Sequence, residues 1–222
     1  MPTPNATRTQ IEEIVLYMMD TGLSDDQNFP YLDSREHPSV RVSFPGAELI
    51  GDALRNRPYE DIYRDFVDSR AFNIKMLDGA LVQMTYQFLQ GGLFNHRLAF
   101  LPSPSLAEFQ NDPQGYFDDD LYADIVASNI VHVPIRFDYD ASEDIHRVLT
   151  HPKSHLTLGQ YRNCRIPVSA PLTPLQFTDF ILRNFYHTAY QNFAADLPAT
   201  SARFSDSILP AEREVVHIVV PS

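Results

Sequence analysis

The sequence predicts an α+β fold, in which helices pack on one face of an antiparallel meander sheet. Two consecutive hairpins are expected over residues 71–101, helical patterns lie on both sides of them in the sequence, and a further strand precedes the last long helix. This order of elements is typical of one antiparallel sheet covered by helices. With 222 residues, of which 44 % are hydrophobic, the chain is long enough for one substantial core. We therefore expect a single domain over residues 1–222.

The first helix is expected at residues 10–21. Thr9 and Glu12 have the spacing of a capping box, and Gly22 is a suitable left-handed stop. The apolar residues that recur along one helical face are Ile11, Ile14, Val15 and Met18. This face is predicted to be buried.

The hairpins carry the strongest local signal. A three-residue turn at 77–79 pairs Met76 with Ala80 and brings the apolar side chains of both strands to one face, with Gly79 in the left-handed position. The same reasoning predicts a second three-residue turn at 90–92. The expected pairs across it are Phe88 with Phe94, Tyr86 with His96, Met84 with Leu98 and Val82 with Phe100.

The remaining elements follow from shorter patterns. Thr173, Pro174 and Gln176 combine a cap, a first-turn proline and a capping-box partner, so a long helix should begin there. Residues 102–128 are rich in Pro, Asp and Asn and read as a loop insertion. The other expected elements are strands at 40–44, 130–139, 154–158, 163–168 and 214–220 and short helices at 47–56 and 58–69.

Composition limits the classes of function. The chain has 17 basic and 29 acidic residues and a formal charge of −12, which argues against a broad basic nucleic-acid clamp but leaves room for a local basic patch. The single Cys164 can form neither an internal disulfide nor a zinc cluster of cysteines. No secretory signal and no apolar run of about 18 residues is present, so we expect a cytoplasmic protein without a membrane contact. The nucleotide-binding glycine motifs are also missing, and no cofactor is expected.

The segment from 136 to 168 is the richest in chemistry. Strand alternation over 130–139 places His132, Arg136 and Asp138 on the face opposite the apolar side chains. His155 would join them from the next strand, and Arg165 should also point away from the core. Arginine binds phosphate oxygens through two donors at once, and histidine titrates near neutrality. We therefore predict a phosphate site held by Arg136 and Arg165, with His132 and His155 as acid and base and Asp138 orienting a histidine.

Two other interpretations of these residues stay open. Polar residues on the outer face of a strand are normal in any half-exposed antiparallel sheet. His151, His155 and Asp138 could alternatively bind a metal, although Pro152 argues against the helix that the His151–His155 spacing would need. We do not assign a metal.

Residues 151–186 resemble the C-terminal signature of a bacterial family catalogued as domain of unknown function 2290. The resembling residues include His151-Pro152, His155-Leu156, Gly159, Cys164-Arg165-Ile166-Pro167-Val168, Pro171, Pro174, Phe180, Arg183 and Phe185, with the preceding 136–140 stretch also fitting. The resemblance implies a context of mobile or host-defence genes and transfers no catalytic residue. The spacing His…Arg-x-Asp…His-Pro-x-x-His is also similar to that of small toxin-like families with suspected nuclease activity.

Two functions are therefore expected as alternatives. The first is a defence or toxin-type phosphodiesterase or nuclease, whose partner is RNA or DNA. The second is a non-catalytic acidic subunit that docks on or inhibits a basic nucleic-acid enzyme, with a partner protein from the same operon. Aromatic residues, 12 % of the chain, are common at such interfaces. A positive pocket around His155 in an otherwise negative protein would favour the first.

Overall fold

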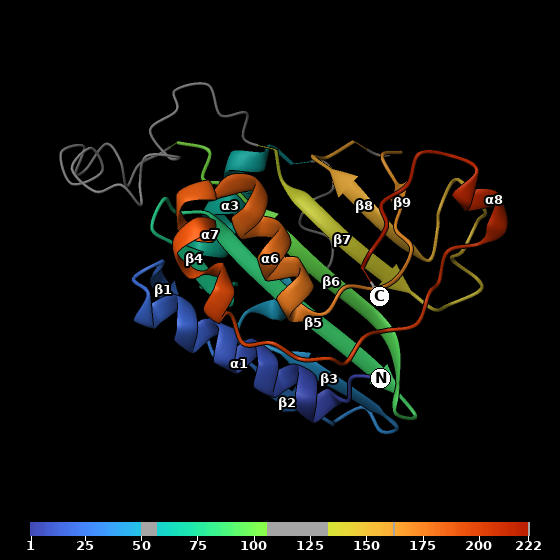
Figure 1. The fold of residues 1–222 in the computed structure, drawn as a ribbon, viewed down its shortest axis with the longest axis horizontal. Coiled ribbons are helices and arrows are strands. Elements are labelled where there is room, and N and C mark those ends of the chain that lie inside the picture. Colours follow the sequence, from blue (N-terminus) through green and yellow to red (C-terminus); the bar gives the residue numbers. More distant parts are fainter. Residues whose placement is uncertain (50–56, 106–132, 162, 222) are drawn as a thin grey trace.

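The computed structural model describes residues 1–49, 57–105, 133–161 and 163–221. In this part of the chain an antiparallel sheet is built in the order β1-β4-β5-β6-β7-β8-β9, with β3 also paired to β5 and β2 paired to β3 (Figure 1). The strands are β1 (Ser24–Gln27), β2 (Tyr31–Asp33), β3 (Ser39–Ser43), β4 (Ile74–Met76), β5 (Leu81–Leu89), β6 (Gly92–Leu101), β7 (Ile135–Asp140), β8 (Ser154–Leu158) and β9 (Ile166–Pro167). The helices are α1 (Pro4–Asp20), α3 (Tyr59–Asp68), α6 (Pro174–Phe185), α7 (His187–Phe193) and α8 (Pro210–Arg213), with 3-10 turns at Ala47–Leu49 and Ala194–Asp196. The predicted α+β class is confirmed.

The meander of β4, β5 and β6 forms as the hairpin pattern predicts. In the first turn, the Met76 amide donates to the Ala80 carbonyl at 2.7 Å, and Gly79 has a φ of +84°. The second turn is one residue shorter than predicted, because Leu89 pairs with Gly92. A bulge then places Phe88 opposite Leu93 rather than Phe94. The extra residue of the bulge restores the predicted pairing from Tyr86–His96 onward.

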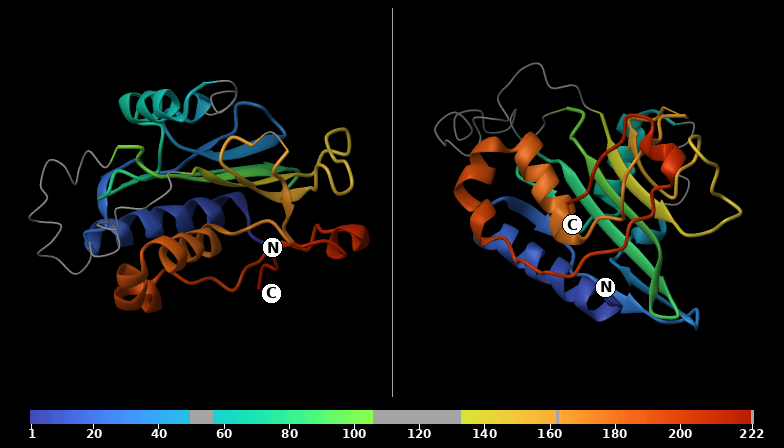
Figure 2. Two further views of the ribbon diagram at one scale, coloured as in Figure 1. Left: turned by 90° about the horizontal axis from the view of Figure 1, so that it is seen from above. Right: turned by 45° about the vertical axis from the view of Figure 1, so that its right-hand side comes forward.

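One face of the sheet packs against α1, α6 and α7 (Figure 2, left). The side chains that form this main core include Ile11, Ile14, Val15, Met18, Val82, Met84, Tyr86, Leu98, Phe100, Phe137, Leu156, Phe177 and Ile181. Helix α6 has the predicted capping box between Thr173 and Gln176. Helix α1 begins earlier than predicted, at Pro4, and the Thr3 hydroxyl accepts from the Ala6 amide. The capping box predicted at Thr9 is therefore wrong, since Thr9 lies inside the helix.

Helix α3 lies on the opposite face of the sheet from the other long helices, so the expectation that the helices pack on one face alone is wrong (Figure 2, left). Its buried Ile62 and Phe66 pack with Phe44 and Phe72 and with alternate side chains of β5 and β6, among them Leu81 and Ala99. Successive strand residues point to opposite faces, so Leu81 packs in this second core while Val82 packs in the main one. The remainder of this face, over β7 and β8, carries polar side chains.

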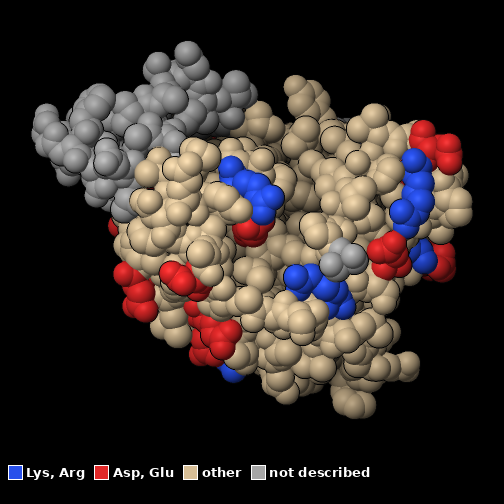
Figure 3. All heavy atoms as spheres, viewed as in Figure 1, with Lys and Arg blue, Asp and Glu red and all other residues tan. Residues whose placement is uncertain are grey.

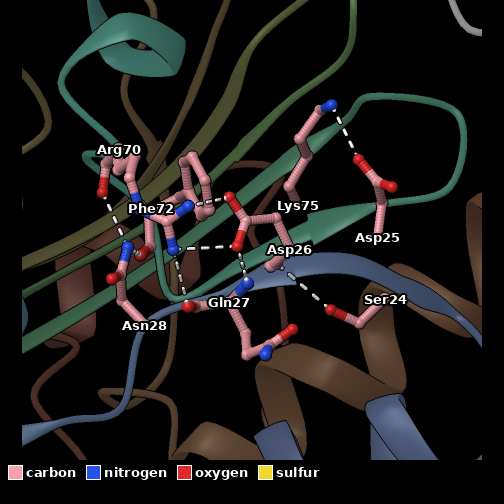
Figure 4. Close-up of polar contacts among 8 residues, drawn as sticks. All are labelled: Ser24, Asp25, Asp26, Gln27, Asn28, Arg70, Phe72 and Lys75. Atoms are coloured by element: carbon pink, nitrogen blue, oxygen red, sulfur yellow. Dashed lines mark hydrogen bonds and ion pairs between the residues drawn. The ribbon is translucent and has the colours of Figure 1, made fainter.

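The edge strand β1 is tied to the meander by polar contacts (Figure 4). The Arg70 guanidinium contacts both carboxylate oxygens of Asp26. The Asn28 amide donates to the carbonyls of Arg70 and Phe72 at 2.8 and 3.0 Å. Lys75 pairs with Asp25 at 2.8 Å. These contacts join β1 and the residue after it to β4 and to the segment between α3 and β4, where the strand pairing itself is short and irregular.

Some sequence predictions are wrong, and others concern residues that the structure does not describe. The strand predicted at 214–220 does not form. The short helix Pro210–Arg213 precedes this segment, and the segment itself makes only an isolated bridge, between Ile218 and Val168. Most of the predicted 102–128 insertion lies outside the described residues, as do 50–56 of the predicted helix 47–56. Among the residues that are described, no helix has the length and apolar character needed to cross a membrane.

Candidate functional site

A row of polar residues crosses the sheet on the face that α3 leaves open. Arg97 of β6 pairs with Asp138 of β7, and Asp138 pairs in turn with His155 of β8. Arg136 precedes Asp138 by two residues and therefore points to the same face. Neighbouring strands lie about 4.8 Å apart, so these four side chains meet over the centre of the sheet.

Asp138 holds two arginines. Its Oδ1 accepts from the Arg97 Nε at 3.2 Å and its Oδ2 accepts from the Arg136 Nε. Burial acts to raise the pKa of this carboxyl, but the charges of Arg136, Arg97 and His155 together outweigh it and lower the pKa below its ordinary value. The carboxylate is therefore ionised at neutral pH, and the two guanidinium groups and one carboxylate form a centre with a net positive charge.

His155 lies beside this centre as a buried, neutral histidine. Its Nδ1 is 2.9 Å from the Pro152 carbonyl, which can only accept, so Nδ1 carries the proton. The Nε2 of the neutral ring is then an acceptor, and it lies 3.8 Å from the Asp138 Oδ2, which is beyond hydrogen-bond distance. Burial is the main reason that the pKa of His155 is lowered to about 4. At neutral pH, Nε2 is consequently available to take a proton.

Arg165 and His151 complete the cluster from the segments that flank β8. The His151 and His155 rings are 5.1 Å apart between centroids. Burial lowers the pKa of His151, and the charge of Arg165 lowers it further; Arg165 acts in the same direction on His155. The guanidinium of Arg165 therefore lies close enough to both rings to affect their protonation.

The structure brings together four of the five residues predicted for the site: Arg136, Asp138, His155 and Arg165. His132 lies outside the described residues. Asp138 was expected to orient a histidine, but it instead contacts the two arginines, and the Pro152 carbonyl orients His155.

Arg97 is a site residue that sequence reasoning missed. The predicted hairpin already placed it on the face opposite His96, which is buried and accepts from the Leu172 amide at 3.3 Å. The missing information was which strand lies beside β6. That pairing joins residues about 40 positions apart, across a stretch with no readable pattern, so spacing alone could not align Arg97 with Asp138.

These residues line a pocket of about 520 Å³. The charged residues of its lining are Arg35, Arg41, Arg97, Arg136 and Arg165 with Asp33, Glu48, Asp138 and Asp140, which gives a formal charge of +1 with the histidines neutral. The whole chain carries −12. The helix-covered face, by contrast, shows basic and acidic side chains in separate small groups (Figure 3). The pocket is thus positive relative to the protein that surrounds it.

The donor set is better suited to an anion than to a metal cation. Both oxygens of Asp138 already contact arginines, and a cation beside them would meet two guanidinium charges. The part of the chain that the structure describes contains no group of three or more His, Cys, Asp or Glu residues arranged to hold a metal ion.

Fold and pocket together define an α+β protein with an arginine-lined site on the open half of its sheet. Residues 23–220 match the model of a family described as an uncharacterized conserved protein, DUF2290. The chain belongs to this family, which confirms the resemblance seen in residues 151–186. No curated protein and no solved structure matches the chain.

Proposed function

We propose that the pocket binds a phosphodiester and that the protein cleaves nucleic acid there. The observation that carries this proposal is the contact of two arginines with one largely buried carboxylate beside a neutral histidine. Arginine is the side chain best suited to bind phosphate oxygens through paired donors. A shared carboxylate holds both guanidinium groups in place before a ligand arrives, which lowers the entropic cost of binding it.

In this proposal the residues have separate roles. Arg97, Arg136 and Arg165 hold the phosphate, and Asp138 positions the first two. The Nε2 of His155 accepts the proton of the attacking hydroxyl or water, since its tautomer is set by the Pro152 carbonyl, while the attacking oxygen forms a new P–O bond. The P–O bond to the leaving oxygen breaks, and that alkoxide takes a proton from water. The low pKa of His155 keeps it unprotonated at neutral pH but makes it a weak base, so most of the rate enhancement would come from the arginine charges.

The test is cleavage of labelled single-stranded RNA and DNA by purified protein, with and without chelator. His155→Asn and Arg136→Gln should each lower the rate at least about tenfold. His187→Asn and Arg183→Gln are matched controls, because both residues are exposed on the helix-covered side. Equal cleavage by all variants would identify a contaminant and refute the proposal. If the nucleic acid binds to the pocket through its phosphates but is not cleaved, the function is limited to binding.

We also propose the biological setting. A nucleic-acid-cleaving protein of this kind would act in the cytoplasm as a defence or toxin-type protein. Expression in a bacterial host should then slow growth, and His155→Asn should relieve the effect. Equal growth inhibition by the two forms would argue against a role for the pocket in toxicity.

The alternative function is an acidic subunit that docks on a basic nucleic-acid enzyme. It is favoured by the net charge of −12 and by exposed apolar side chains in two segments that the His146–Glu212 contact brings together. These side chains are Ile145, Val148, Leu149, Val215, Val216 and Val219. Co-expression with the product of a neighbouring gene should then yield a stable complex, and Val216→Asp should weaken it. A complex indifferent to this substitution would place the interface elsewhere.

A further inference from the structure

The pocket is elongated across the strands of the sheet. Residues that pair directly across neighbouring strands form rows that run at right angles to the strands. One such row runs from β2 to β7 and consists of Asp33, Arg41, Gln87, Asn95 and Asp140. The next row on the same face joins Thr85 to Arg97, Asp138 and His155. Residues of both rows line the same pocket, so its floor is a strip of sheet surface at right angles to the strands.

Arginines lie toward both ends of this pocket, and each is held by a carboxylate: Arg41 pairs with Glu36 at 3.1 Å, and Arg136 pairs with Asp138. Arg41 is on β3 and Arg136 is on β7, with β5 and β6 between them. Three strand intervals separate β3 from β7, which corresponds to about 14 Å across the sheet. Arg136 also lies four residues along β7 from Asp140, which shares the row of Arg41, so the two arginines are offset by about a further 13 Å along the strands. The floor between them presents the uncharged Thr85, Gln87 and Asn95, together with Arg97 of β6, which contacts Asp138.

We infer that the ligand is a segment of single-stranded nucleic acid that lies across the strands, with different phosphates at the Arg41 end and at the Arg136 end. This inference rests on the proposed function and specifies its substrate class. A single phosphate group cannot reach both ends. The amide and hydroxyl side chains on the floor are of the type that binds unpaired base edges and sugars, and a strand would exchange for these contacts the hydrogen bonds that Asn95 donates to Gln87 and Gln87 donates to Ser39. Tyr31 lines the Arg41 end and is 39 % exposed, so its ring is available for a base to stack on.

The pocket is too small to enclose a duplex. Its volume is about 520 Å³. Pockets of this volume take small ligands, and a double helix would have to stay outside.

The first experiment measures affinity against ligand length. The probes are inorganic phosphate, adenosine monophosphate, phosphorothioate-linked single strands of two to ten nucleotides, which resist cleavage, and a duplex of the longest sequence. Affinity should rise at least about tenfold between the monophosphate and a strand of about four nucleotides, and then level off. The duplex should bind at least about tenfold more weakly than its single strand.

The second experiment separates the two ends. Arg41→Gln should weaken binding of the longer strands, lower the salt dependence of log K by about 0.7, and leave the monophosphate affinity unchanged. Arg136→Gln should weaken both ligands, and Arg136→Lys, which keeps the charge, should restore part of the affinity. Arg183→Gln on α6 is the control and should change neither. Thermal melts of each variant confirm that it is folded.

The outcomes distinguish this inference from the function on which it rests. If no probe binds to the folded protein, both the proposed function and the inference fail. If the monophosphate binds as tightly as the longer strands and Arg41→Gln has no effect, phosphate binding stands and the extended site is refuted. A duplex that binds as tightly as its single strand would likewise overturn the inference alone.

Discussion

At the scale of single residues, Asp138 determines how the site is held together. Replacing it with asparagine should lower the free energy of unfolding by about 2–4 kcal/mol, because two arginines over a largely buried position lose their shared anion. The side chain of Asp138 is 15 % exposed. Chemical denaturation measures this loss. Asp179→Asn breaks an exposed pair with Arg183 and should change stability by less than about 0.5 kcal/mol. Similar losses of unfolding free energy for Asp138→Asn and Asp179→Asn would contradict the structural role given to Asp138.

The buried histidines predict how stability depends on pH. Burial lowers the pKa of both His96 and His155 to about 4, against 6.5 for an unfolded chain. Between these values the unfolded chain binds more protons, so stability is complete above pH 6.5 and falls as the pH drops toward 4. Going from pH 7.5 to 5 should cost about 2 kcal/mol for each histidine.

Denaturation curves at several pH values check this, and His155→Asn should remove about half of the loss. The lowered pKa of Asp138 acts only below its ordinary range near 3.8 and does not affect this window. A stability that does not change between pH 7.5 and 5 would show that neither histidine is buried as a neutral ring.

At the scale of elements, the second hairpin turn is the sharpest test of the meander. Gly91 has a φ of +82° and nothing within 4 Å of an added Cβ, so Gly91→Ala should cost about 1–2 kcal/mol from backbone strain alone. Gly92 begins β6 outside the left-handed region, and an added Cβ there meets the Leu89 carbonyl at an ordinary 3.7 Å. Gly92→Ala should therefore be nearly neutral in a thermal melt. A larger loss of stability for Gly92→Ala than for Gly91→Ala would instead support the three-residue turn that the sequence predicted.

At the scale of the whole molecule, the sheet is supported from both faces. Phe66 of α3 is 1 % exposed in the second core, and Phe66→Ala should cost about 3–5 kcal/mol in denaturant unfolding. The exposed Phe29, at 44 %, is the matched control and should cost less than about 1 kcal/mol on truncation. A small effect at Phe66 would mean that α3 is peripheral to the fold.

The sequence alone determined the parts of this protein that depend on local physics. Strand alternation, the turn at Gly79 and the capping box at Thr173 each involve residues a few positions apart, so their energies are readable from spacing. The same alternation placed Arg136, Asp138 and His155 on the polar side of their strands. Where two local solutions have similar energies, as in the turns at 77–79 and 90–92, the pattern chose correctly once and missed once.

Only the tertiary structure decided which residues meet across the sheet. The pairing of β6 with β7 brings Arg97 to Asp138, and the position of β2 and β3 beside β5 places Arg41 at the far end of the same pocket. It also decided that Asp138 contacts arginines while Pro152 holds His155. Such contacts join segments far apart in the chain, and their free energy depends on burial and on strand order. Neither quantity is present in the spacing of residues along one sequence.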